Sequence, residues 1–225
     1  MIRQLAFDLP YREARGREDF FVSPANALAL AAVEGWRGWP GGRLVLCGPP
    51  GSGKTHLVQV WQATLPAPAA VVAGAALRAA DLPALAAAGA VAVEDAAAVA
   101  GDPAAETALF HLHNLLAQGG GHLLVTAATP PRDWGLTLPD LASRMQGAAL
   151  ARLEAPDDAL LSAVLAKQFA DRQIAISPAL IPYLVARMDR SMAAARDLVA
   201  RLDAAALARG QAVTRALAAT VLDSA

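Results

Sequence analysis

The chain has 225 residues, of which 56% are hydrophobic and 17% are charged, and its formal net charge is −1 at pH 7. This length can bury a sizeable core in one domain with a smaller attached part, and the near-neutral charge does not favour strong direct binding of DNA. A single cysteine, Cys47, leaves no internal disulfide, and the sequence shows neither a signal peptide nor an unbroken apolar run of about 18 residues, so we expect a cytoplasmic protein without a membrane span.

Most of the chain alternates segments with strand and helix character. Residues 1–16 mix charges and show no lasting period, so we expect a tail there. Ser23 and Pro24 are typical of the start of a helix, as are Asp102 and Pro103. Short apolar runs predict buried strands. The expected helices are 23–36, 54–65, 79–89, 102–121 and 138–146, and the expected strands are 43–47, 69–74, 90–95, 122–128 and 148–156.

Strands that alternate with helices predict an α/β fold with a mostly parallel sheet flanked by helices. The pattern changes near residues 154–156, because only helices are expected after them. These later helices are expected at 157–173, 177–188, 191–210 and 214–224. The predicted organisation is a tail (1–16), an α/β part (17–155) and a small helical lid (156–225).

The stretch GPPGSGKT, from Gly48 to Thr55, fits the pattern of a phosphate-binding loop. A strand is expected before it and a helix after it, which is the context that such a loop needs. Its glycines let several backbone N–H groups face one point, and the following helix offers its positive N-terminal end. Lys54 should reach the β- and γ-phosphates, and the Thr55 hydroxyl should bind Mg²⁺. The candidate nucleotide-binding residues are Pro50, Gly51, Ser52, Gly53, Lys54, Thr55 and His56.

An acidic pair, Glu94 and Asp95, ends the third expected strand in VAVED. A magnesium site beside a phosphate-binding loop needs a carboxylate at such a strand end. By position, Glu94 would hold the metal through its water shell, and Asp95 would polarise an attacking water. The alternative is a solvated acidic turn. Together with the loop, the pair predicts a site for ADP or ATP with Mg²⁺.

The order of the motifs resembles one family of nucleotide-binding proteins. The segments GPPGSGKTHL, VAVED, HLLVTAATPPRDW, LPDLASRM and MDRSM are similar, in this order, to those of AAA+ proteins of the DnaA/Hda family, over about residues 1–222. The resemblance implies an AAA+ P-loop sheet with a small C-terminal helical lid. It also implies that Phe21, Val22 and Asn26 contact the adenine, and that Arg144 is a catalytic arginine finger that reaches the nucleotide of a neighbouring subunit.

The resemblance extends to QLAFDL near the N-terminus, which is similar to the motif by which Hda-like members dock on the DNA polymerase sliding clamp. It implies that Gln4 enters a polar subsite while Leu5, Phe7 and Leu9 fill an apolar pocket, as alternate anchors of an extended peptide do. The implied partners are the sliding clamp and DnaA, and apolar lid surfaces suggest a homo-oligomer. The implied function is to promote hydrolysis of DnaA-bound ATP in trans and so prevent re-initiation of replication.

Three positions depart from the family pattern. Glu94 stands where the family has an aspartate, and its longer side chain weakens a magnesium site of strict geometry. Ala128 and Ala193 replace two polar residues that sense the phosphates, although Arg190 and Arg196 flank Ala193. These departures indicate a nucleotide holder with weak or no hydrolysis in cis. The alternatives are an autonomous P-loop ATPase or kinase, and a helicase-loader-like AAA+ protein that binds single-stranded DNA.

Overall fold

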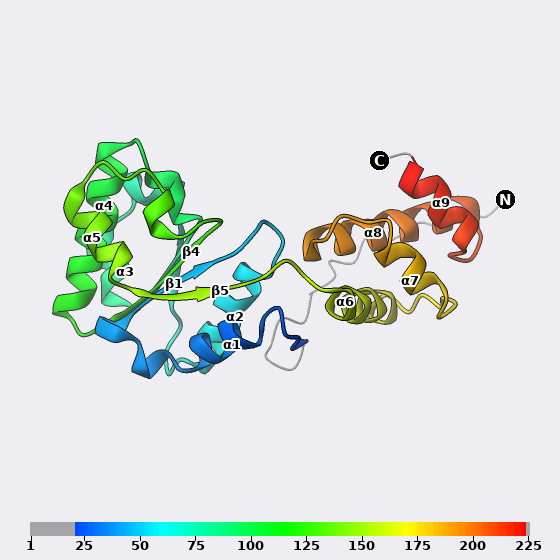
Figure 1. Ribbon diagram of the computed structural model, residues 1–225, viewed down its shortest axis with the longest axis horizontal. Coiled ribbons are helices and arrows are strands. Elements are labelled where there is room, and N and C mark those ends of the chain that lie inside the picture. Colours follow the sequence, from blue (N-terminus) through cyan, green and yellow to red (C-terminus); the bar gives the residue numbers. More distant parts are fainter. Residues whose placement is uncertain (1–20, 224–225) are drawn as a thin grey trace.

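A computed structural model describes residues 21–223, and its central feature is a five-stranded sheet with the order β2-β3-β4-β1-β5 (Figure 1). Every neighbouring pair of strands is parallel, which confirms the predicted sheet. Parallel strands are buried on both faces, which explains runs as apolar as LVLC in β1. The strands are β1 (Arg43–Cys47), β2 (Ala70–Ala73), β3 (Ala90–Glu94), β4 (His122–Ala127) and β5 (Ala149–Arg152).

Helices cover both faces of this sheet. One face carries α1 (Ala27–Glu34) and α2 (Lys54–Thr64), and the other carries α3 (Leu82–Ala87), α4 (Pro103–Gln118) and α5 (Pro139–Gln146). Successive residues of a strand point to opposite faces. Leu44 and Leu46 of β1 therefore pack with α1 and α2, whereas Val45 between them packs with α4 and α5. Two hydrophobic cores, one on each face, hold the sheet between them.

The prediction that α4 starts at Asp102 and Pro103 is confirmed, and Asp102 caps the helix with its side chain. The Asp102 carboxylate accepts hydrogen bonds from the N–H groups of Ala104 (2.9 Å) and Ala105 (3.2 Å), and Pro103 occupies the first turn. These contacts satisfy N–H groups that have no partner within the helix. They also lower the pKa of Asp102, because the hydrogen bond from Ala105 favours the charged carboxylate.

The first helix begins later than predicted. α1 starts at Ala27, and Ser23 is not its side-chain cap, although the Ser23 carbonyl accepts a hydrogen bond from the Ala27 N–H (3.0 Å). The Ser23 N–H instead donates to Asn26 Oδ1 (2.9 Å), so residues 24–26 form a turn. The prediction of a start at Ser23 is wrong because the Asn26 side chain bonds back to the backbone and replaces the first helical turn.

All described elements after β5 are helices: α6 (Asp158–Asp171), α7 (Leu180–Val185), α8 (Met192–Arg209) and α9 (Arg215–Asp223). They share a hydrophobic core of their own, which includes Leu161, Phe169, Leu184, Leu198 and Leu217. Figure 1 shows them beside the sheet, joined to β5 by an extended stretch. We propose that the chain divides into an α/β body (17–155) and a helical lid (156–225).

Short 3-10 segments connect several elements. They are η2 (Trp36–Gly38), η3 (Pro40–Gly42), η4 (Gly74–Ala79), η5 (Ala96–Val99) and η6 (Pro131–Asp133). No helix within residues 21–223 is both long and apolar enough to cross a membrane. The predicted tail (1–16), with Gln4, Leu5, Phe7 and Leu9, lies outside the described residues.

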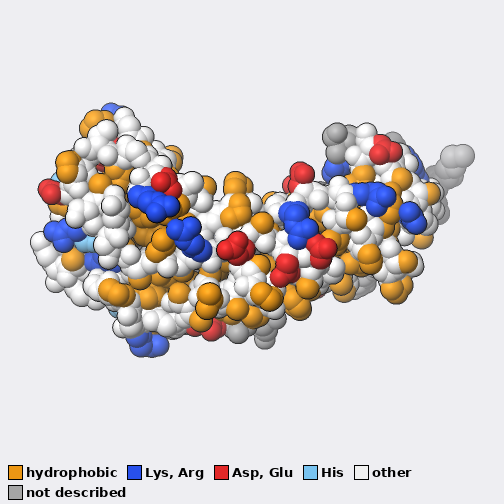
Figure 2. Space-filling model, viewed as in Figure 1, with side chains coloured by type: hydrophobic (Ala, Val, Ile, Leu, Met, Phe, Trp, Pro, Cys, Tyr) orange, Lys and Arg blue, Asp and Glu red, His pale blue; other side chains and the backbone are white. Residues whose placement is uncertain are grey.

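The surface mixes charged and apolar side chains. On the face shown in Figure 2, Lys and Arg side chains are interspersed with Asp and Glu side chains among many hydrophobic ones, and the outline is hollowed between the body and the lid. The basic side chains on this face do not gather into one broad patch, as a surface for nucleic acid usually requires.

Candidate nucleotide-binding site

A cavity of about 780 Å³ lies between the body and the lid, at the carboxyl ends of the strands. This edge of a parallel sheet is where ligands of open α/β proteins bind. The cavity brings together predicted site residues that are far apart in the sequence. Those that line it are Phe21, Pro50, Gly51, Gly53, Lys54, Thr55, His56 and Asp95.

The glycine-rich loop follows β1 and leads directly into α2, as predicted. Gly51 and Gly53 have positive φ angles (71° and 104°), which residues with a Cβ rarely adopt. Gly48 has no room for a Cβ, which would lie 2.7 Å from the Leu153 carbonyl oxygen. These constraints turn the loop sharply, so that the N-terminus of α2, with its positive partial charge, faces the cavity.

Lys54 is held at the mouth of this loop. Its Nζ donates hydrogen bonds to the carbonyl oxygens of Gly48 (2.7 Å) and Pro49 (3.0 Å). Partial burial lowers the pKa of Lys54, and the nearby carboxylate of Asp95 acts in the opposite direction. Lys54 and Asp95 both line the cavity, which therefore contains one cation and one carboxylate at the glycine-rich loop.

Asp95 owes its position to two neighbours that the sequence did not reveal as site residues. It has a left-handed backbone conformation (φ 50°, ψ 47°), and its N–H donates to the Thr126 hydroxyl of β4 (3.1 Å). The Asp95 backbone also packs closely against Gly74. Only glycine fits there, because a Cβ at this position would lie 2.6 Å from the Asp95 carbonyl oxygen. Thr126 and Gly74 thus fix the turn that carries the carboxylate into the cavity.

Glu94 and Thr55 were predicted to hold a metal. Thr55 lines the cavity, whereas Glu94 does not, although its Oε1 is buried and has no hydrogen-bond partner among the described residues. Glu94 follows Ala92 by two positions on β3, so it points to the face that carries α2. A hydroxyl and an unsatisfied carboxylate oxygen suit Mg²⁺, which takes few protein ligands and several waters or phosphates. The chemistry of these two residues fits that ion. Within residues 21–223, no group of three or more His, Cys, Asp or Glu side chains could hold a metal ion, either here or elsewhere.

Of the three residues expected to contact adenine, only Phe21 lines the cavity. Phe21 lines the cavity and is 47% exposed, whereas Val22 is exposed and does not line it. Asn26 is buried, and its Nδ2 donates to the Phe21 carbonyl (2.9 Å) while its Oδ1 accepts from the Ser23 N–H. The structure thus shows Asn26 fixing the backbone that carries Phe21. Ser52 is buried behind the loop and does not line the cavity.

The lid supplies the opposite wall. Leu160, Val164 and Gln168 are spaced by four along α6, and Ala193 and Arg196 lie on one face of α8. The sequence analysis did not assign the three α6 residues to the site, although their spacing marks one helix face. Ala128, which follows β4, also lines the cavity, so both alanines that replace polar sensors face it.

The two arginines that flank Ala193 have different surroundings. Arg190 donates to Asp158 Oδ1 (2.6 Å) and to the Pro156 carbonyl (2.9 Å), and it does not line the cavity, whereas Arg196 does. The next residues of this segment contact the glycine-rich loop, because the Met192 N–H donates to the Gly51 carbonyl (2.8 Å). The start of α8 therefore rests directly on the loop.

Arg144 lies in the last turn of α5, is exposed, and does not line the cavity of its own chain. The start of α5 is fixed by Glu106 of α4, which is fully buried. Its carboxylate accepts hydrogen bonds from the N–H groups of Gly101 (3.1 Å), Thr137 (2.9 Å) and Leu138 (2.7 Å) and from the Thr137 hydroxyl (3.0 Å). Burial acts to raise the pKa of Glu106, but these hydrogen bonds outweigh it and lower that pKa.

No protein-family model matches the chain. Among solved structures, domain III of the replication initiation protein DnaA from Thermotoga maritima is similar with a TM-score of 0.82 and 20% identity, over 96% of this chain and 98% of that one. AMPPCP-bound DnaA from Aquifex aeolicus is similar with a TM-score of 0.71 and 17% identity, over 86% of this chain and 66% of that one. A RuvB variant from Thermotoga maritima is similar with a TM-score of 0.68 and 19% identity, over 88% of this chain and 66% of that one. The chain thus spans about two thirds of the two longer proteins, and its fold is the α/β AAA+ fold that the sequence predicted.

Proposed function

We propose that this chain is a cytoplasmic regulator of DNA replication initiation of the Hda type. In this proposal it binds an adenine nucleotide in the cavity between body and lid, docks on the sliding clamp through Gln4, Leu5, Phe7 and Leu9, and presents Arg144 to ATP bound by DnaA. The hydrolysis that follows in DnaA would prevent re-initiation. The overlap with nearly the whole of DnaA domain III supports a replication protein built on this module.

The nucleotide-binding part of the proposal rests on the lining of the cavity. Loop N–H groups, the start of α2 and Lys54 offer positive charge to a diphosphate, while Phe21, Leu160 and Val164 offer apolar contact to a base. A similar DnaA binds AMPPCP, an analogue of ATP, which favours an adenine nucleotide here. A bound Mg²⁺, held by Thr55 and Glu94, would neutralise phosphate charge.

The single observation that carries the regulatory role is the placement of Arg144. An arginine accelerates phosphoryl transfer by stabilising negative charge that develops on the transferred group. Arg144 cannot do this in its own cavity, because it does not line that cavity, but it is exposed on a helix that Glu106 holds in place. An exposed, positioned guanidinium suits a nucleotide that a second protein carries.

The test is a reconstitution with ATP-loaded DnaA and DNA-loaded sliding clamp. Wild-type protein is expected to stimulate phosphate release, and Arg144→Ala is expected to lower that stimulation by about 100-fold or more, since arginine fingers contribute roughly 10³–10⁵ in rate. Arg132→Ala, which removes another exposed arginine of the body, is the matched control. Equal stimulation by wild type and Arg144→Ala would refute the proposed role.

Docking on the clamp is tested separately. Gln4→Ala combined with Leu5→Ala should abolish capture by immobilised clamp and leave nucleotide binding unchanged, because the proposal assigns the nucleotide to other residues, chiefly Lys54 and Thr55. If the double variant is retained on the clamp as well as the wild type, the tail is not the docking segment.

An autonomous ATPase is the second candidate, and one observation favours it. Asp95 lines the same cavity as Lys54 and Thr55, where a carboxylate could orient an attacking water. Turnover of ATP by the isolated protein at a rate that Asp95→Asn abolishes would favour this candidate. A helicase-loader-like role predicts instead salt-sensitive binding to single-stranded DNA.

A further inference from the structure

The wall of the nucleotide-binding cavity includes a glutamine that the sequence did not mark as a site residue. Gln59 lies on α2 and lines the cavity, four positions after Thr55. Residues four apart lie on one face of a helix, so the face that brings Thr55 to the cavity also brings Gln59. At about 1.5 Å of rise per residue, Gln59 lies about 6 Å farther from the phosphate-binding loop along the helix axis.

The carboxamide of Gln59 lacks a donor for its acceptor atom. Its Oε1 is buried and has no hydrogen-bond partner among residues 21–223. A buried acceptor without a donor costs stability, and such groups are rare in native proteins. Gln62, the next glutamine on α2, is different, because its Nε2 donates to the Ala69 carbonyl (3.2 Å) and it does not line the cavity. The unmet acceptor therefore belongs to the glutamine that faces the cavity.

The cavity wall contains one other carboxamide within the described chain, that of Gln168 on α6, and this one is already engaged. Its Oε1 accepts a hydrogen bond from Arg172 Nη1 (2.5 Å). Of the two carboxamides, Gln59 is thus the one that can offer an acceptor to a ligand. The terminal torsion of a glutamine side chain turns over a broad range, so Oε1 can rotate toward the cavity.

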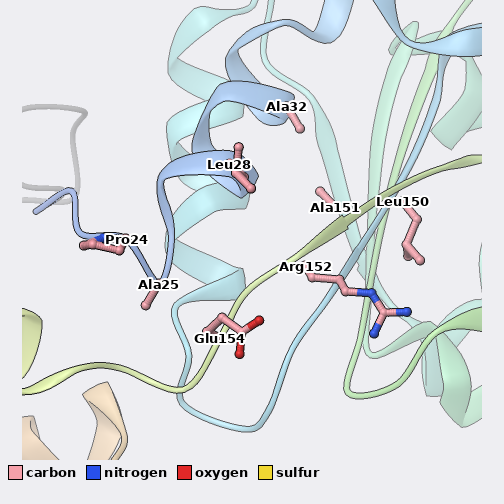
Figure 3. Close-up of a pocket in the computed structure, with 8 residues that line it drawn as sticks. All are labelled: Pro24, Ala25, Leu28, Ala32, Leu150, Ala151, Arg152 and Glu154. Atoms are coloured by element: carbon pink, nitrogen blue, oxygen red, sulfur yellow. The ribbon is translucent and has the colours of Figure 1, made fainter.

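The base of a nucleotide bound here has to fit within this same cavity. A diphosphate at the loop and the start of α2 leaves the ribose and the base to extend away from the loop. The groove of about 400 Å³ between α1 and β5 (Figure 3) shares no lining residue with the cavity, so it does not extend the cavity for the base. Phe21, Leu160 and Val164 supply apolar contact in the cavity, and Gln59 adds a hydrogen-bonding group.

We propose that the Gln59 carboxamide recognises the base and selects purines that carry a 6-amino group. Its Oε1 accepts a hydrogen bond from that amino group, and its Nε2 donates to the ring nitrogen beside it. A carboxamide carries an acceptor and a donor side by side, which complements the donor and acceptor that adenine presents together. This inference rests on the adenine-nucleotide binding proposed above, and it adds the residue that reads the base.

The test compares two ligands that differ only in the amino group. They are ADP and purine ribonucleoside 5′-diphosphate, in which a hydrogen atom replaces the 6-amino group. Isothermal titration calorimetry of the wild type should give about tenfold tighter binding of ADP, because the second ligand leaves Oε1 without a donor. Gln59→Met keeps the length of the side chain but removes the amide. This variant should bind ADP about tenfold more weakly and should bind the two ligands with about equal affinity.

The ratio of the two affinities separates base recognition from a structural role. If Gln59 only stabilised α2, its replacement would weaken both ligands alike and leave their ratio unchanged. Gln62→Met is the matched control, because it makes the same substitution on the same helix outside the cavity. It should keep the tenfold preference for ADP.

Two results would overturn the assignment of Gln59 and leave the proposed nucleotide site intact. One is a wild type that binds the two diphosphates equally, and the other is a Gln59→Met variant that keeps the preference for ADP. A wild type that binds neither ligand would overturn the proposed site and this inference together. If Gln59→Met does not fold, Gln59→Ala replaces it, with the same loss of preference expected.

Discussion

Replacing Glu106 by glutamine tests how the body positions α5. The carboxylate accepts hydrogen bonds from Gly101, Thr137 and Leu138, and it is fully buried. A glutamine keeps one acceptor oxygen but turns an NH₂ group toward buried donors. Hydrogen bonds to a charged group contribute about 1.5–3 kcal/mol each, and an unsatisfied buried donor costs about 1–3 kcal/mol. One lost bond and one unsatisfied N–H together predict a loss of about 2.5–6 kcal/mol in the free energy of unfolding.

The pH dependence of this loss has a definite sign. The folded-state pKa of Glu106 is lowered from the ordinary value of 4.5, so its stabilising contribution is fully present above pH 4.5. It is lost only as the pH falls through the lowered folded-state value. The difference in stability between wild type and Glu106→Gln should therefore be the same at pH 7 and pH 5.5, and it should shrink below pH 4.5.

Urea unfolding followed by tryptophan fluorescence is the assay, because Trp36, Trp39, Trp61 and Trp134 all lie in the body and so report on it. Asp140→Asn, which changes an exposed carboxylate in the first turn of α5, is the control and should cost less than about 1 kcal/mol. A Glu106→Gln variant as stable as that control at pH 7, or a difference that grows on acidification, would refute the reasoning.

Three further predictions concern single positions. Gly51→Ala should abolish binding of a fluorescent ADP analogue, because φ is 71° there and a Cβ would lie 2.4 Å from Ser191 Cβ; unchanged affinity would contradict this. Thr126→Val should destabilise the body by about 1–2 kcal/mol in the same urea assay and lower any ATP hydrolysis in cis, because the Asp95 N–H loses its acceptor. Burial raises the pKa of the Cys47 thiol, so it should resist iodoacetamide at pH 8 in the native state and react in urea.

The sequence predicted the elements whose causes are local. The phosphate-binding loop, β1 and α2 follow from residues within a short stretch, and Asp102 caps α4 from its first turn. The contacts that position the site could not be predicted in this way. Asp95 and Thr126 are 31 positions apart, as are Glu106 and Thr137, and each pair meets only after the strands and helices have packed. A hydroxyl in a buried strand and a glutamate in an alanine-rich helix carry no local sign of such roles.

The early part of the chain also shows why side-chain competition limits prediction. Ser23 followed by Pro24 is typical of a helix start. The Asn26 side chain, however, hydrogen-bonds to the Ser23 N–H and to the Phe21 carbonyl, and the helix begins only after Asn26. The predicted adenine-contacting segment is thus shaped by an amide that bonds backward along the chain. The spacing of Leu160, Val164 and Gln168 on α6 was visible, but which side of the lid would face the loop depended on how α8 rests on Gly51.

The hydrogen bond between the Glu154 N–H and the Ala25 carbonyl joins the start of the described chain to the stretch that leads from β5 into α6. A second connection between these parts is the hydrogen bond from the Met192 N–H to the Gly51 carbonyl. A substitution or a ligand that displaced residues 21–25 would therefore disturb one of the two backbone contacts of the described chain that hold the lid helices and their connecting stretch to the rest of it.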